Sequence, residues 1–367
     1  MEKKLNLLDK IALISMMGGP GLSYGKIYLY HIVSIIYIIK FFIENKKIEK
    51  KYLKKNMILI LFFCFSVFRL ISVKSLEYGL KNQVYLIIGL NIYILLHYFL
   101  NKNTNETLNM LKKIVIFAIV VGYFESFGYF RWYTTIYESN VLNPASFYGN
   151  MNDFAVLLTL VFPFIILYKN KFKSFICGII IIILLLKCDS RAANIAIILQ
   201  IIIICFFKAK NKILFLIISV FGMILNLNII VEKIDFLIKF IKFSSTKMDS
   251  IGIRQELIKK LVKEILSAEK FIFGIGGGNS KIISGKIAAT YSFLLELFVE
   301  YGVIIFILLI LFYLKLLIKN FSYIDCYKIA IFTSLIGFLV SVNAMSGGIY
   351  YFPFWIMLSL SSYEKGV

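Results

Sequence analysis

The chain has 367 residues, of which 60% are hydrophobic and only 17% are charged, and its formal net charge is +21. This composition excludes an ordinary soluble domain of the same length, which would need far more polar surface. The hydrophobic runs are long and unbroken, which excludes the alternating pattern of a membrane β-barrel and favours helices that satisfy their own hydrogen bonds in lipid. We therefore expect an all-α, polytopic membrane protein.

Hydrophobic segments follow one another along the chain, and each is a candidate transmembrane helix. They lie near residues 8–19, 27–43, 56–72, 79–100, 110–130, 152–168, 173–187, 192–207, 212–231, 291–318, 324–342 and 348–362. The first is the weakest, because it is short and is interrupted at Gly18-Gly19-Pro20. The pattern predicts about twelve transmembrane helices in a single integral membrane domain covering residues 1–367.

The distribution of lysine predicts the orientation of these helices. Short cytoplasmic loops of membrane proteins carry an excess of lysine and arginine. With both termini in the cytoplasm, most of the lysines fall in inner loops, including the cluster between Lys46 and Lys55. Without the first segment, Lys3, Lys4 and Lys10 would lie on the outer face, so the twelve-helix arrangement fits the rule better. The same rule explains the positive charge without nucleic acid, for which no soluble domain remains.

Residues 232–289 form one long segment between hydrophobic runs, and we expect a large extracytoplasmic loop between the ninth and tenth helices. Long translocated loops are exempt from the charge rule, and loops of this length are usually functional. Apolar side chains recur with helical spacing over 251–267, which predicts an amphipathic helix with Arg254 on its apolar face. The stretch 233–243 is both basic and apolar, and is predicted to lie on the membrane surface.

Arginine is rare in this chain and unevenly placed. Only four of the 41 basic residues are arginine, and in this topology Arg69, Arg131, Arg191 and Arg254 all lie at the outer face. The planar guanidinium of arginine binds phosphate or carboxylate through two hydrogen bonds at once and stays protonated. This placement indicates an outer-face site for an anionic substrate, led by Arg191 and Arg254. The alternatives are a side chain that snorkels to the membrane interface for Arg191 and a salt bridge for Arg254.

The sequence shows no pattern typical of a metal or cofactor site. The cysteines form no CxxC pair, and most lie in or beside apolar runs: Cys64, Cys177, Cys188, Cys205 and Cys326. The two histidines, His31 and His97, lie in different hydrophobic segments, so they predict no metal cluster. We expect neither a metal ion nor a cofactor.

Four short motifs occur in order over about residues 145–315. They are Tyr148-Gly149-Asn150-Met151-Asn152-Asp153-Phe154-Ala155; Cys188-Asp189-Ser190-Arg191-Ala192-Ala193; Arg254 with Phe273-Gly274-Ile275-Gly276-Gly277-Gly278-Asn279; and Thr290-Tyr291-Ser292-Phe293-Leu294-Leu295-Glu296-Leu297 with Glu300-Tyr301-Gly302. In order, spacing and topology they resemble the O-antigen polymerase and ligase superfamily, which includes Wzy-type polymerases of capsule, exopolysaccharide and O-antigen. The resemblance implies a GT-C-like glycosyltransferase of the bacterial plasma (inner) membrane, with its active site facing the periplasm or the cell exterior.

The resemblance also implies a metal-independent, inverting glycosyl transfer. The donor would be a glycan on undecaprenyl diphosphate, and the acceptor a hydroxyl of another lipid-linked repeat unit. Arg191 and Arg254 would act catalytically by stabilising the charge that grows on the leaving diphosphate. The expected substrate contacts are Tyr148, Asn150, Asn152, Ser190, Gly276, Gly278, Asn279 and Tyr291, where glycine lets backbone N–H groups approach an anion. A flexible turn is the alternative interpretation of the stretch 273–279. The candidate general bases are Asp153, Asp189 and Glu296.

A repeat-unit polymerase is the first hypothesis, and a glycan ligase of the same superfamily is the second. Many ligases carry a His-Asn pair where this chain has Thr290-Tyr291, and the outer loop here contains no histidine, which favours a polymerase. A lipid-linked oligosaccharide flippase or transporter would more often show two similar halves and charges inside its helices. A structural membrane subunit is the remaining alternative. Membrane lipids, a chain-length regulator and a flippase are the expected partners.

Overall fold

The computed structural model describes residues 3–24, 27–43, 56–130, 132, 143–168, 170–209, 256–283, 292–344 and 348–364. These residues are largely helical, apart from a short antiparallel hairpin of β1 (Ser23–Tyr24) and β2 (Ile27–Tyr28). Among these described residues, four helices are long and apolar enough to cross a membrane: α5 (Leu76–Lys102), α6 (Thr104–Ser126), α9 (Arg191–Lys208) and α15 (Phe293–Asn320). The prediction of a helical, membrane-embedded protein is confirmed at this level.

Shorter helices make up the rest of the bundle. They are α1 (Leu7–Gly18), α2 (Leu29–Ile43), α4 (Met57–Phe68), α7 (Met151–Ile166), α8 (Lys171–Cys188), α16 (Cys326–Ser341) and α17 (Phe352–Ser362). Short 3-10 turns adjoin them: η1 (Gly19–Leu22), η2 (Arg69–Ser72), η3 (Ser146–Tyr148), η4 (Val342–Ala344) and η5 (Gly348–Tyr350). Each predicted segment within the described residues therefore contains a helix, and the ninth, 212–231, lies outside these residues.

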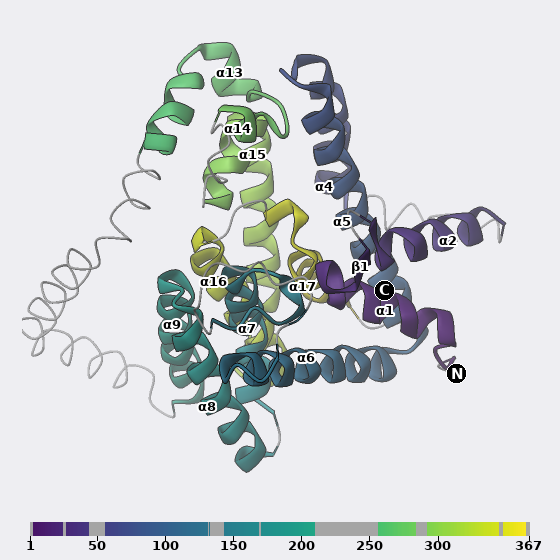
Figure 1. Ribbon diagram of the computed structural model, residues 1–367, viewed down its shortest axis with the longest axis vertical. Helices are drawn as coiled ribbons and strands as arrows, with labels where there is room; N and C mark the ends of the chain where they lie inside the picture. Colours follow the sequence, from purple (N-terminus) through teal and green to yellow (C-terminus); the bar gives the residue numbers. More distant parts are fainter. Residues whose placement is uncertain are drawn as a thin grey trace, which may run out of the picture.

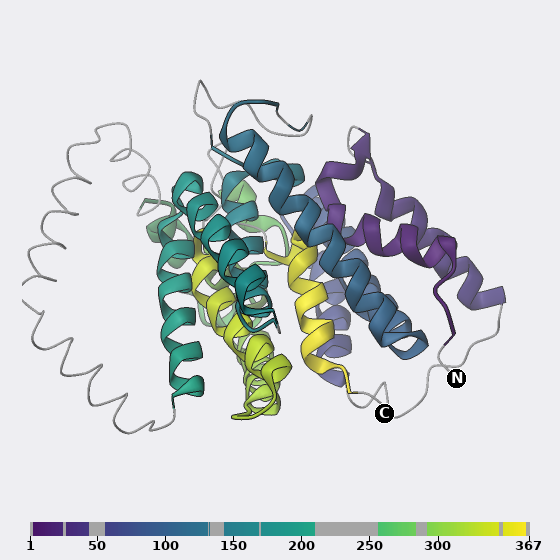
Figure 2. The same ribbon diagram turned by 90° about the horizontal axis from the view of Figure 1, so that it is seen from below.

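The helices pack in two groups, one of α7, α8, α9 and α16 and the other of α1, α5, α6 and α17. Contacts among α15, α16 and α17 connect the two groups. Helix α7 packs against α8, α9 and α16, while α5 packs against α17 and α6 against α1. Helix α9 also packs closely against α16, and Figure 2 shows these two helices in the same group. Helix α15 contacts α4, α16 and the short helix α13 (Ala268–Phe273), and Figure 1 shows α13 and α14 (Asn279–Ile283) at its upper end.

A buried amide joins α7, α9 and α16 near their centres. The side-chain nitrogen of Gln200 donates to the carbonyls of Thr159 at 2.9 Å and Thr333 at 3.3 Å. Gly337 makes room for this amide, because a Cβ at this position would overlap the side chain of Gln200. Small residues let helices approach closely where lipid supplies no hydrophobic driving force between them.

Gly337→Ala is therefore expected to destabilise the protein by about 1–3 kcal/mol, because the added methyl displaces Gln200 from its two carbonyls. Thermal unfolding in detergent measures this loss. The double variant Gly337→Ala, Gln200→Ala is expected to recover most of the loss, since the methyl then occupies space that the amide has left. Losses that simply add in the double variant would contradict this account of the contact.

Both ends of the described chain lie at the corner between α5 and α6. The backbone nitrogen of Lys3 donates to the carbonyl of Lys102 at 3.2 Å. At the other end of the chain, the hydroxyls of Tyr363 and Thr104 lie 3.0 Å apart. An ion pair of 2.5 Å between Lys102 and the buried Asp9 secures α1 at the same corner. The N- and C-terminal ends thus lie on one side of the bundle (Figure 2).

Candidate functional site

The first motif lies at the start of α7. Asn150 caps the helix by accepting a hydrogen bond of 2.7 Å from the backbone nitrogen of Asn152, and its side chain is exposed. Tyr148 is buried instead, and its hydroxyl donates to the carbonyl of Met17 at 2.8 Å. Asp153, in the first helical turn, is partly exposed. Of these residues, Asn150, Asn152 and Asp153 are accessible, whereas Tyr148 holds the segment in place.

Glu125, which sequence reasoning missed, fixes the chain that leads into this motif. Its buried carboxylate accepts backbone N–H groups from Trp132 at 2.8 Å, Ala145 at 2.9 Å and Ser146 at 2.5 Å. Ser146 has a φ of 50°, a left-handed conformation that L-residues adopt at a cost. The carboxylate therefore stabilises an otherwise unfavourable turn immediately before Tyr148.

The second motif forms the corner between α8 and α9. Asp189 is exposed and left-handed, with a φ of 52°, and Arg191 is the exposed first residue of α9. Between them, the Ser190 hydroxyl is buried and has no hydrogen-bond partner in the part of the chain that the structure describes. Within the same residues, Arg191 makes no ion pair. A guanidinium, an unpaired hydroxyl and the positive end of a helix dipole are together suited to an anion.

The third motif is a tight turn, here called the Gly-rich turn (residues 274–279). Gly274, Gly276 and Gly278 have φ values of 76°, 93° and 83°, which L-residues rarely adopt. A Cβ at Gly278 would lie only 2.7 Å from the Tyr78 carbonyl. The buried Asn279 side chain accepts from the backbone nitrogen of Lys74 at 3.0 Å and donates to the carbonyl of Ile275. Packing against the start of α5 therefore explains Gly278, whereas a Cβ at Gly274 would lie 2.3 Å from the Glu300 carbonyl of α15.

The fourth motif belongs to the first turns of α15. Glu296 and Glu300 are buried there, and the Ser280 hydroxyl lies within hydrogen-bond distance of both carboxylates. The Tyr301 hydroxyl accepts from the side chain of Asn82 at 2.5 Å. Of the predicted residues, Glu296 therefore belongs to a buried polar cluster with Ser280, Glu300, Tyr301 and Asn82 of α5, while Gly276 and Asn279 lie in the neighbouring turn.

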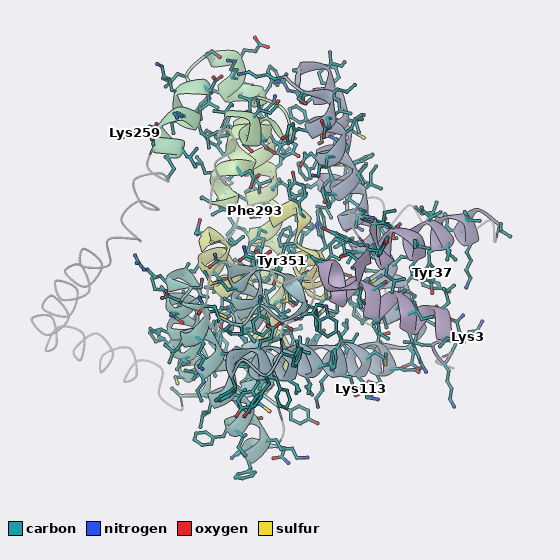
Figure 3. The ribbon with its side chains drawn as sticks, in the orientation of Figure 1. Lys3, Tyr37, Lys113, Lys259, Phe293 and Tyr351 are labelled. Atoms are coloured by element: carbon teal, nitrogen blue, oxygen red, sulfur yellow. The ribbon has the colours of Figure 1, made fainter. Side chains whose placement is uncertain are left out.

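Two consecutive tyrosines before α17 connect this cluster with the first motif. The Tyr350 hydroxyl donates to the Asn82 side chain at 2.7 Å. The Tyr351 hydroxyl donates to the Asp153 carbonyl at 2.8 Å, and its ring lies 6.0 Å from that of Tyr148. Figure 3 shows Tyr351 near the centre of the molecule, close to Phe293 at the start of α15.

Helices α7, α9, α15 and α17 begin at one end of the bundle, here called the motif end. Turn η4 packs against both α9 and α15, and its Asn343 lies 3.3 Å from the Ser292 hydroxyl that precedes α15. On the other side, the Lys187 amine donates to the carbonyl of Ser126 at the end of α6. The four motifs therefore gather at the motif end, except for Arg254 and Tyr291, which lie outside the described residues.

An apolar pocket lies between α4, α15, α16 and α17. Phe293 and Leu297 line it from the same turns of α15 that carry Glu296, and Phe62 and Trp355 line it from α4 and α17. Such a lining suits a hydrocarbon chain and offers no partner to a polar group. Among the described residues, no group of three or more His, Cys, Asp or Glu side chains could hold a metal ion.

The chain matches no model of a known protein family, and a search of curated proteins finds no relative.

Proposed function

We propose that this protein is a membrane glycosyltransferase that polymerises oligosaccharide repeat units carried on undecaprenyl diphosphate, at the outer face of the plasma membrane. The observation that supports it best is the corner at Ser190 and Arg191. An exposed arginine without an ion pair in the described chain and a buried hydroxyl without a partner both lie at the N-terminus of α9. These groups suit the diphosphate of a lipid-linked donor.

The proposed reaction breaks the bond between the anomeric carbon of the donor glycan and the diphosphate. The acceptor hydroxyl oxygen bonds to that carbon from the opposite face, and the diphosphate leaves with the electron pair. Arg191 and the first N–H groups of α9 stabilise the charge on the departing oxygens, and Arg254 joins them in the proposal. The acceptor proton passes to a carboxylate, for which Asp153, Asp189 and Glu296 are the candidates.

The apolar pocket supports a lipid-linked substrate. Phe293 and Leu297 line it from the same turns of α15 that carry Glu296 of the polar cluster. A polar headgroup held at the motif end and a hydrocarbon chain held between helices is the arrangement that an amphipathic substrate requires. The sugar contacts in the proposal are the exposed Asn150 and its neighbour Asn152, together with Tyr291.

Deletion of the gene in its host tests the function. Loss of a polymerase is expected to remove long-chain glycan and to leave single repeat units on undecaprenyl diphosphate at the outer face of the membrane. Glycan ladders on gels and mass spectra of the extracted lipids measure both effects. Accumulation of long lipid-linked polymer would instead identify a ligase, and single units confined to the cytoplasmic face would identify a flippase.

A further inference from the structure

Helix α15 is divided at Gly302. This residue has φ 74° and ψ 174° inside an otherwise helical run from Phe293 to Asn320. In an unbroken helix the carbonyls of Val299 and Glu300 would accept hydrogen bonds from the backbone nitrogens four residues later, at Val303 and Ile304. A break at Gly302 frees these two carbonyls, and buried carbonyls need other donors.

The Gly-rich turn supplies those donors. The backbone nitrogen of Ile275 donates to the Val299 carbonyl at 2.9 Å, and that of Gly276 donates to the Glu300 carbonyl at 3.0 Å. The approach is so close that a Cβ at Gly302 would overlap the carbonyl of Ile272. The same two carbonyls can therefore be satisfied in two ways, either by the docked turn or by continuation of the helix.

The other side of the turn is held by the corner between α4 and α5. The buried Arg69 guanidinium donates to the Gly274 carbonyl at 2.6 Å through Nη2, while its Nε has no hydrogen-bond partner in the described chain. Lys74 adds its backbone bond to Asn279 and an ion pair of 3.6 Å to Glu264. Partial burial opposes ionisation of Glu264, but hydrogen bonds and charge from Lys270 and Lys74 outweigh it and lower the pKa of this carboxyl.

We propose that the Gly-rich turn and the break at Gly302 form a two-position latch. With the turn docked, α15 is kinked, and Ser280, Glu296 and Glu300 are closed in the buried cluster. With the turn released, α15 continues as a straight helix through Gly302, and this cluster opens to the motif end. Arg69 is the positioning residue that favours the docked position. The latch depends on backbone geometry and is independent of the proposed glycosyl transfer.

Gly302→Ala tests the latch, because alanine disfavours the positive φ and its methyl group blocks the docked turn. Hydrogen–deuterium exchange is measured on the full chain in lipid nanodiscs, with Ile307→Ala, at an exposed position of the same helix, as control. We expect the amides of Ile275 and Gly276 to exchange at least about tenfold faster, since each loses a hydrogen bond. The amides of Val303 and Ile304 are expected to exchange more slowly, because they bond to the released carbonyls.

Arg69→Ala provides a second test that adds no bulk and does not depend on accumulation of the glycine variant. It is expected to speed exchange at residues 274–276 and again to protect Val303 and Ile304. In the double variant, Arg69→Ala should add nothing to Gly302→Ala, because the turn is already released. Unchanged exchange at Ile275 and Gly276, faster exchange at Val303 and Ile304, or additive effects would each overturn the latch. Loss of glycan polymer has no part in this test.

Discussion

Arg191→Lys is expected to lower glycan polymerisation at least about a hundredfold, the size of effect seen when one preorganised donor to a developing oxyanion is removed. Lysine keeps the positive charge but loses the planar fork that contacts two phosphate oxygens at once. Arg191 is exposed and makes no ion pair in the described chain, so the substitution should leave the fold and the protein level unchanged. Arg254→Lys is expected to have the same effect if both side chains hold the diphosphate.

The measurement is the length distribution of surface glycan in a deletion strain that carries each variant, with the membrane level of the protein measured in parallel. Lys81→Gln provides a stricter control, because Lys81 is also exposed and its change removes a positive charge, which Arg191→Lys keeps. Single lipid-linked units should accumulate in the arginine variants and not in the control. Glycan of normal length in Arg191→Lys would end the assignment of this residue to the diphosphate.

Glu125→Ala is expected to destabilise the protein by about 3 kcal/mol or more. The change leaves the N–H groups of Trp132, Ala145 and Ser146 without their acceptor, and each buried, unsatisfied donor costs about 1–3 kcal/mol. Because this carboxylate holds the turn before Tyr148, the variant should also lose polymerisation through misplacement of the first motif.

Glu125→Gln is expected to lie between the unaltered protein and the alanine variant. One amide oxygen can still accept two of the N–H groups, but the amide NH2 then faces the third. Thermal unfolding in detergent and amide exchange over residues 143–150 measure the series. Glu77→Ala, at an exposed position of α5, is the control and should change stability by less than about 0.5 kcal/mol. Equal stability of the alanine variant and this control would contradict the structural role of Glu125.

The positions of the helices could be read from the sequence because lipid imposes a simple rule. A segment that crosses hydrocarbon must be apolar and must satisfy its own backbone, so apolar runs and helices coincide. The shifts are small: the expected run 79–100 became α5 at Leu76–Lys102, and 173–187 became α8 at Lys171–Cys188. The short hairpin at Ser23–Tyr24 was missed, because two residues per strand carry no readable alternation.

The candidate site was predicted only in part, because its motifs are local and its contacts are not. The corner at Ser190 and Arg191 could be anticipated, since a serine and an arginine at the start of an apolar segment are read from adjacent residues. Arg69 was counted among the outer arginines, but its partner Gly274 lies 205 residues away in the sequence. No single-sequence pattern indicates that pairing.

Polar residues near the ends of apolar segments were the signal that could have found more of the site. Glu125 lies close to the end of the fifth segment, and Asn82 near the start of the fourth. Buried polar groups require partners, so each such residue predicts a contact even where the partner is unknown. In the structure, Glu125 bonds to backbone N–H groups before Tyr148, and Asn82 bonds to Tyr301 and Tyr350.

The corner between α5 and α6 bears on the number of times that the chain can cross a membrane. Lys3 and Tyr363 both contact this corner, so the two ends of the described chain lie on the same side of the bundle. A chain whose two ends lie on one side of a membrane crosses it an even number of times, and the proposed twelve-helix arrangement meets this condition. Reporter proteins fused to the two ends should therefore always report the same compartment.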